Sequence, residues 1–203
     1  MNISKVIFTY AYPLDQNRRK LFQDNNWPHY PTSEEVMKKV EEYKGIWEEV
    51  NATNRIIKRI IELLGVDYPR DIEAFVLGSG MQPMSTPLLI PVMRKEIPYS
   101  KEEFITLMIH ELTHIFAAGT KAHEGIRNYW NMVREKYISE SVLVQNHLIV
   151  YAVLQTIVEE LFGKELAERL IQAKDPDYIR SIELTNQLGR EHIINEFREL
   201  TKS

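Results

Sequence analysis

Apolar side chains recur every three or four residues through most of the second half of the chain, which predicts helices there. The longest of these runs extends from about residue 140 to residue 162, after Ser139 as a cap and before Gly163. Shorter periodic runs predict four further helices, at 126–137, 164–173, 178–188 and 190–201. The second half of the chain is therefore expected to be mainly helical.

The first half contains three β-branched and aromatic or apolar runs, which predict strands at 5–12, 71–77 and 87–93. Pro91 favours an edge position for the third of these strands. Thr32 and Glu35 form a capping box that predicts a helix with Val36, Val40, Tyr43 and Trp47 on one stripe. A second helix is expected over 54–64, whereas 14–31 is expected to be an irregular loop. Strands followed by helices predict an α+β fold, with helices packed on a small sheet.

One further helix connects the two halves. Ser100 and Glu103 form a second capping box, the apolar run 104–109 follows, and Gly119 is the expected C-cap. Because this segment is apolar almost all round, we expect the helix to be buried.

Composition narrows the function classes. With 44% hydrophobic and 27% charged residues, the chain is typical of soluble globular proteins. A formal charge of −4 argues against a nucleic-acid binder, and the absence of cysteine excludes disulfides and thiolate metal sites. Polar residues interrupt the apolar run 142–158, and no signal-peptide pattern follows Met1, so we expect a cytoplasmic protein without a membrane span.

The segment His110-Glu111-Leu112-Thr113-His114 lies inside the buried helix and carries candidate chemistry. On a helix, residues i and i+4 share one face, so both imidazoles can bind one Zn²⁺ ion. Glu111 lies beside that face, where its carboxylate can accept a proton from a metal-bound water and pass it to a leaving amine. Two histidines and a carboxylate within a buried helix are costly unless a metal neutralises the group.

This pentapeptide resembles the signature of the zincins, a large group of zinc metallopeptidases. The resemblance implies one zincin-like domain over residues 1–203, with an upper lobe of about 1–119 and a helical lower lobe of about 120–203. It also implies a substrate cleft between the lobes, a third metal ligand from the lower lobe, and an edge strand, here at 87–93, that binds extended substrate. Ala117 and Thr120 stand where the metzincin subgroup has glycine and histidine, which excludes that subgroup.

The third ligand has several candidates. His147 lies amid apolar residues of the long predicted helix and leads, since Glu140, His147 and Tyr151 share its inward stripe. Glu140 is the alternative ligand, or an outer partner of one. Glu135 lies at about the distance at which thermolysin-like enzymes place their glutamate, and His123 resembles a histidine that precedes an aromatic pair in some small zincins.

The expected function is therefore a zinc-dependent metallohydrolase, most simply a peptidase acting on peptides or proteins. Glu111 is the expected general base and acid, and Tyr151 the candidate donor to the oxyanion that forms when water attacks the carbonyl. Two alternatives stay open: a zinc-binding regulatory protein of the same fold without turnover, and a helical protein that contains the motif by coincidence.

Overall fold

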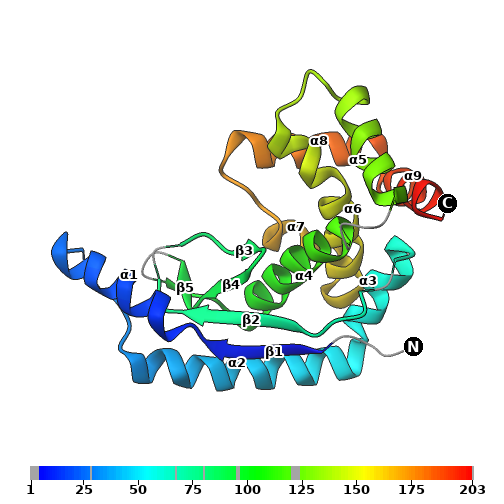
Figure 1. The fold of residues 1–203 in the computed structure, drawn as a ribbon. Helices are drawn as coiled ribbons and strands as arrows, with labels where there is room; N and C mark the ends of the chain where they lie inside the picture. The colour runs from blue at the N-terminus through cyan, green and yellow to red at the C-terminus, as the bar shows by residue number, and fades with distance from the viewer. Residues whose placement is uncertain are drawn as a thin grey trace. The chain divides into compact units, whose positions relative to one another are not determined.

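The structure is a computed structural model that describes residues 5–27, 29–66, 68–79, 81–94, 97–119 and 124–202. The fold is α+β, as predicted, with a small mixed sheet and many helices (Figure 1). The chain forms two compact units, each made of two segments: Met1–Thr53 with Pro69–Leu107 (unit 1), and Asn54–Tyr68 with Met108–Ser203 (unit 2). The prediction of one zincin-like domain with a lobe boundary near residue 119 stays a prediction.

The sheet of unit 1 has the strand order β1-β2-β4-β3. Strands β1 (Val6–Tyr10), β2 (Ile72–Leu77) and β4 (Leu88–Pro91) are parallel, and the two-residue β3 (Met84–Ser85) pairs antiparallel with β4. A separate two-stranded ribbon joins β5 (Met93–Arg94) to β6 (Ile97–Pro98). The three predicted strands are therefore present.

The prediction that the segment 87–93 forms an edge strand is wrong. β4 lies between β2 and β3, so the edge on that side is β3. β3 pairs only with Leu88 and Leu89, and Pro91 lies beyond this pairing, where a missing N–H breaks no bond to β3. Proline is thus tolerated in an interior strand because its neighbour is very short.

The prediction of an irregular loop over 14–31 is also wrong for the first half of that segment, because helix α1 extends over Tyr12–Asp24. Pro13 occupies the first turn of this helix, where its fixed φ and missing N–H are favourable. Asp15 is fully buried and its carboxylate accepts hydrogen bonds from the hydroxyls of Tyr10 (2.7 Å) and Tyr30 (2.6 Å), from the Gly78 amide (2.7 Å) and from the Arg19 guanidinium (3.1 Å). These hydrogen bonds to Asp15 therefore hold α1 in place. The weak apolar pattern of the segment did not reveal them.

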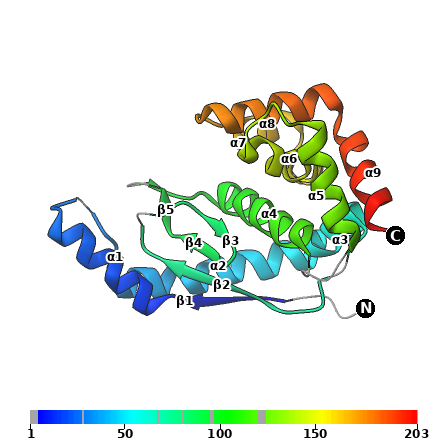
Figure 2. The ribbon, with the colours of Figure 1, turned by 45° about the horizontal axis from the view of Figure 1, so that its top comes forward.

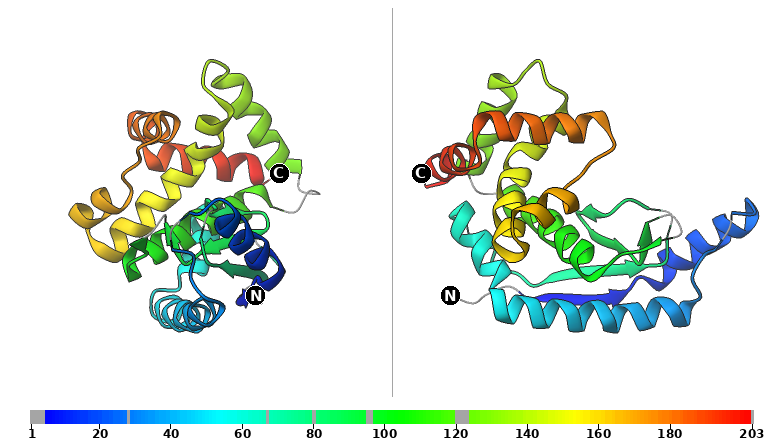
Figure 3. Two further views of the ribbon diagram at one scale, coloured as in Figure 1. Left: turned by 90° about the vertical axis from the view of Figure 1, so that its left-hand side faces the viewer. Right: turned by 180° about the vertical axis from the view of Figure 1, so that it is seen from behind.

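Helix α2 (Ser33–Asn54) runs alongside the strands of unit 1, as Figures 1 and 3 both show. The predicted capping box is present, with the Thr32 amide donating to Glu35 (2.7 Å) and the Glu35 amide to Thr32 Oγ1 (3.2 Å). Tyr43 of the predicted stripe stacks on Phe104 with ring centroids 4.0 Å apart. Helix α2 is thereby fixed to the beginning of α4 (Lys101–Ala118).

In unit 2, helix α6 (Val142–Phe162) lies among the other helices (Figure 2; Figure 3) and packs most extensively against five of them. These five are α3 (Ile56–Leu64), α5 (Glu124–Lys136), α7 (Lys164–Leu170), α8 (Pro176–Leu188) and α9 (Arg190–Thr201). By length and composition α6 could cross a membrane, yet 67% of its apolar window is buried inside the structure. Burial of this kind is compatible with a core helix of a soluble protein, and the cytoplasmic location stays a prediction.

Candidate metal centre

Helix α4 begins and ends where the sequence predicts. The Ser100 amide donates to Glu103 (2.8 Å) and the Glu103 amide to Ser100 Oγ (3.1 Å), which completes the capping box. At the other end Gly119 adopts a left-handed φ of 58°, and its amide donates back to the carbonyl of Ile115 (3.2 Å). Both ends of α4 are therefore capped, and the motif lies inside the helix.

Two residues of the motif pack in the protein interior, and its two histidines lie on another side of the helix. Leu112 and Thr113 are fully buried, and the Thr113 hydroxyl donates to the Ile109 carbonyl (2.7 Å), so this polar group is satisfied within the helix. His110 and His114 are only partly buried and lie one turn apart on the other side. The two x positions of the motif therefore anchor the helix, while the histidines stay available for a ligand.

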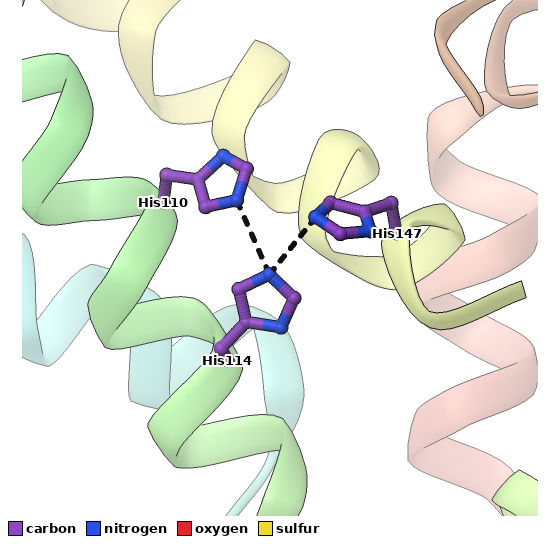
Figure 4. Close-up of side chains that lie close together, drawn as sticks. All are labelled: His110, His114 and His147. Atoms are coloured by element: carbon purple, nitrogen blue, oxygen red, sulfur yellow. Dashed lines mark hydrogen bonds between the residues drawn. The ribbon is translucent and has the colours of Figure 1, made fainter. Parts of the chain in front are cut away.

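His147 of α6 completes a cluster of three histidines, which we call the His cluster (Figure 4). The His114 Nε2 atom lies 3.2 Å from His110 Nε2 and 3.2 Å from His147 Nε2, and the candidate ligand atoms all lie within 4.8 Å of one another. Figure 4 shows the three rings pointing these nitrogens toward one another from α4 and α6. Two nitrogens bound to one tetrahedral zinc at about 2.0–2.1 Å are themselves about 3.3 Å apart. The observed spacing fits that geometry.

The hydrogen bond of His147 sets its tautomer. Its Nδ1 atom lies 2.8 Å from the Leu143 carbonyl, which can only accept, so Nδ1 carries the hydrogen and Nε2 presents a lone pair to the cluster. Metal-binding histidines are commonly oriented in this way through their second nitrogen. A single proton on His114 Nε2 cannot satisfy both of its 3.2 Å neighbours, whereas one cation accepts all three lone pairs.

Burial keeps the His cluster neutral. It holds the pKa of His110 well below the usual range, with the neighbouring His114 and His147 adding to the effect. It lowers the pKa of His114 to about 3, and it also lowers the pKa of His147. Neutral imidazoles are the form that binds metal, so the cluster is ready for a ligand at neutral pH.

Two tyrosines lie against the His cluster, and Glu111 is the sequence neighbour of His110. Glu111 is 8% exposed, and burial raises its pKa to about 7. The Tyr151 ring lies 5.9 Å from the rings of both His110 and His147, and the Tyr178 ring lies 4.8 Å from His147 in an edge-on contact. Burial raises the pKa of both phenols, and the charge of Glu111 contributes to the shift of Tyr178. Both hydroxyls therefore stay protonated at neutral pH and can donate.

Tyr178 is the residue that the sequence interpretation missed. It lies in the first turn of α8, which begins at Pro176 after Asp175 as N-cap, two residues before the predicted start. The Asp-Pro pair is a helix-start signal and would have placed Tyr178 in that turn. The contact with His147, however, depends on the packing of α8 against α6, which residue spacing does not reveal.

The other candidates for the third ligand are placed elsewhere. The predicted cap Ser139 is wrong, because Ser141 caps α6 by accepting from the Val144 amide (3.2 Å). Glu140 therefore precedes the helix and instead pairs with Arg180, whose guanidinium lies 2.5 Å from its carboxylate. Glu135 is exposed on α5, and His123 lies outside the described residues. The structure brings His110, His114 and His147 together and keeps Glu140 and Glu135 out of this group.

Glu140→Gln is expected to leave zinc binding unchanged, because Glu140 pairs with Arg180 and lies outside the His cluster. Loss of an outer partner of the metal would instead weaken zinc binding moderately. The hydrogen bonds from Arg180 lower the pKa of Glu140, so the pair stabilises the fold above the carboxyl's ordinary titration range and loses this contribution as pH falls. Because the pair is partly exposed, we expect at most about 1 kcal/mol of destabilisation at neutral pH. Zinc titration checks the first expectation, which a tenfold lower zinc affinity would contradict, and urea unfolding of the variant checks the second.

Searches of protein-family models, curated proteins and solved structures give no match to this chain. Its function is therefore inferred from the geometry of the site itself.

Proposed function

We propose that the chain is a metal-dependent hydrolase of zincin-like fold that cleaves peptide bonds, with zinc held by His110, His114 and His147. The observation that carries the proposal is the position of His147 Nε2, 3.2 Å from His114 Nε2 although 33 residues separate the two in sequence. Three histidine ligands leave one position of a tetrahedral metal open, which is typical of catalytic zinc, whereas structural sites use four protein ligands.

When bound, zinc would supply a Lewis acid and lower the pKa of a bound water to about 7. Glu111 is suited to hold and move the proton, because a carboxyl with a pKa of about 7 is divided between its charged and neutral forms at neutral pH. Tyr151 and Tyr178 are suited to donate hydrogen bonds to a developing oxyanion, since their phenols stay protonated. Each of these roles is assigned to a side chain of unit 2.

The buried Glu111 favours a catalytic over a purely structural role. A carboxyl whose pKa is raised from 4.5 to about 7 destabilises the fold at neutral pH, since the unfolded chain ionises at a lower pH than the folded one. Such a cost is common at functional sites and uncommon elsewhere.

The test of the proposal combines metal analysis with hydrolysis. The purified protein is expected to contain about one zinc per chain and to cleave a mixed peptide library, and a chelator is expected to abolish cleavage until zinc is restored. Because three imidazoles also suit copper, nickel and iron, the elemental analysis should include these metals. Zinc without cleavage of any peptide would favour the regulatory alternative, and absence of any bound metal would contradict the proposal.

A pH series on the metal-free protein tests the state of Glu111. Its folded pKa is raised, so the penalty on stability begins as pH rises past 4.5 and is complete above about 7. Glu111→Gln is therefore expected to stabilise the chelated protein by about 1–3 kcal/mol at pH 8 and by little at pH 4. Urea unfolding at both pH values measures this difference, and equal effects at the two would show that Glu111 ionises normally.

A further inference from the structure

Two polar contacts hold the beginning of α8 against the segment where α6 begins. The Ser141 hydroxyl donates to Asp177 (2.8 Å), and the Arg180 guanidinium binds the Glu140 carboxylate through its Nε atom (3.1 Å) and through a terminal nitrogen. A guanidinium that binds a carboxylate through two nitrogens is held in one orientation, unlike a simple charge pair. We call these four residues, Glu140, Ser141, Asp177 and Arg180, the α6–α8 clamp.

Tyr178 lies between the two clamp residues of α8. It follows Asp177 directly and precedes Arg180 by two residues, so the three lie within about one helical turn. The Tyr178 ring contacts the His147 ring edge-on, with ring centroids 4.8 Å apart. On α6, Ser141 precedes His147 by six residues, a rise of about 9 Å. Both clamp contacts are therefore close in the chain to the point where α8 meets the His cluster.

The buried packing of α8 begins only after Tyr178. The buried residues of this helix are Ser181, Leu184 and Thr185, whereas residues 174–176 and Ile179 are exposed. The Tyr178 hydroxyl makes no hydrogen bond to the part of the chain that the structure describes. Because a helix end with few buried contacts opens locally at little cost in free energy, the position of Tyr178 depends on the clamp.

We propose that the α6–α8 clamp is a positioning device of the proposed hydrolase, which holds Tyr178 against the His cluster so that its hydroxyl donates to the developing oxyanion. The four clamp residues are positioning residues, since they act through Tyr178 and are not members of the His cluster. The inference depends on the proposed function. It gives the pair of Glu140 and Arg180, which has no place in the metal centre, a part in the reaction.

The clamp is expected to affect the reaction more than the fold. An ion pair between partly exposed side chains stabilises a protein little, so a variant without the pair should stay folded. A misplacement of about 1 Å in the site, by contrast, can lower the rate by up to about a hundredfold. Because an oxyanion forms only during the reaction, a misplaced donor lowers kcat and leaves KM nearly unchanged.

Charge reversal tests this proposal. Arg180→Glu places two carboxylates together at the clamp, and Glu140→Arg combined with Arg180→Glu restores an ion pair. In the zinc-loaded protein, with a fluorogenic peptide that the wild type cleaves, Arg180→Glu is expected to lower kcat about tenfold. KM and zinc affinity should stay within about twofold of the wild type. The double reversal is expected to recover most of the lost kcat, and urea unfolding of each variant checks that it is folded.

Two further measurements show whether the clamp acts through Tyr178. In a Tyr178→Phe background, Arg180→Glu is expected to cause no further fall in kcat, because the group that the clamp positions is already absent. In the metal-free protein, an NOE between the Tyr178 and His147 rings is expected for the wild type, lost in Arg180→Glu and regained in the double reversal. The NOE measurement requires neither metal nor hydrolysis.

Arg59→Glu is the matched control, because Arg59 binds Glu160 (2.7 Å) near the other end of α6 and its side chain is 36% exposed, against 38% for Arg180. It should change neither kcat nor the NOE. If Arg180→Glu keeps the wild-type kcat and NOE, or lowers kcat equally with and without the Tyr178 hydroxyl, the clamp does not position Tyr178 although the hydrolase proposal stands. If the zinc-loaded wild type cleaves no peptide, the hydrolase proposal fails and the role of the clamp fails with it.

Discussion

His147→Ala is expected to remove zinc from the protein as completely as His114→Ala. Both changes delete one of three imidazoles that lie 3.2 Å from a neighbouring ligand nitrogen. We expect the zinc dissociation constant to rise roughly a thousandfold or more, beyond the 10–100-fold that is typical for loss of an outer partner. Competition titration with a zinc chelator dye measures this constant for each variant.

His192→Ala is the matched control, because His192 is exposed on α9 and outside the His cluster. Its zinc affinity should equal that of the wild type. A His147→Ala variant that still binds one zinc with wild-type affinity would show that α6 does not supply the third ligand.

Glu111→Gln is expected to keep the metal and to lose hydrolysis. The amide has nearly the shape of the carboxyl but cannot accept the proton, so kcat should fall by about 10²–10⁴-fold. Zinc stoichiometry should stay near one per chain, because the ligand atoms that lie within 4.8 Å of one another come from the three histidines. Initial rates and elemental analysis of the same sample separate the two effects.

Glu135→Gln provides the control for this second change, since Glu135 is exposed on α5. It should alter neither rate nor metal content. Equal loss of zinc in Glu111→Gln and His110→Ala would mean that Glu111 is a ligand and not a proton carrier, and undiminished hydrolysis would remove it from the mechanism.

Local signals in the sequence predicted the elements that position the site. The Ser100 and Glu103 capping box and Gly119 predicted where α4 begins and ends, since each satisfies backbone groups within a few residues. The apolar period of α6 likewise placed His147 in the interior of a buried helix. Such features depend only on neighbouring residues, and this is why periodicity and capping reveal them.

The misplaced cap Ser139 of α6 is a local error, whereas the other errors depend on contacts between distant segments. Asp15 stabilises α1 through Tyr30 and Gly78, and the strand order that puts β4 inside the sheet depends on the two-residue β3. Arg180, forty residues from Glu140, engages the carboxylate that seemed a possible ligand. Tyr178 reaches His147 only through the packing of α8 on α6. None of these contacts has a spacing signal in the sequence.

The most direct test of the central claim is a crystal structure of the zinc-loaded protein with anomalous data collected at the zinc edge. We expect one anomalous peak per chain, about 2.0–2.1 Å from an imidazole nitrogen of each of His110, His114 and His147. A peak bound by His110 and His114 with a carboxylate oxygen at about 2 Å, and with His147 more than about 4 Å away, would contradict the three-histidine centre.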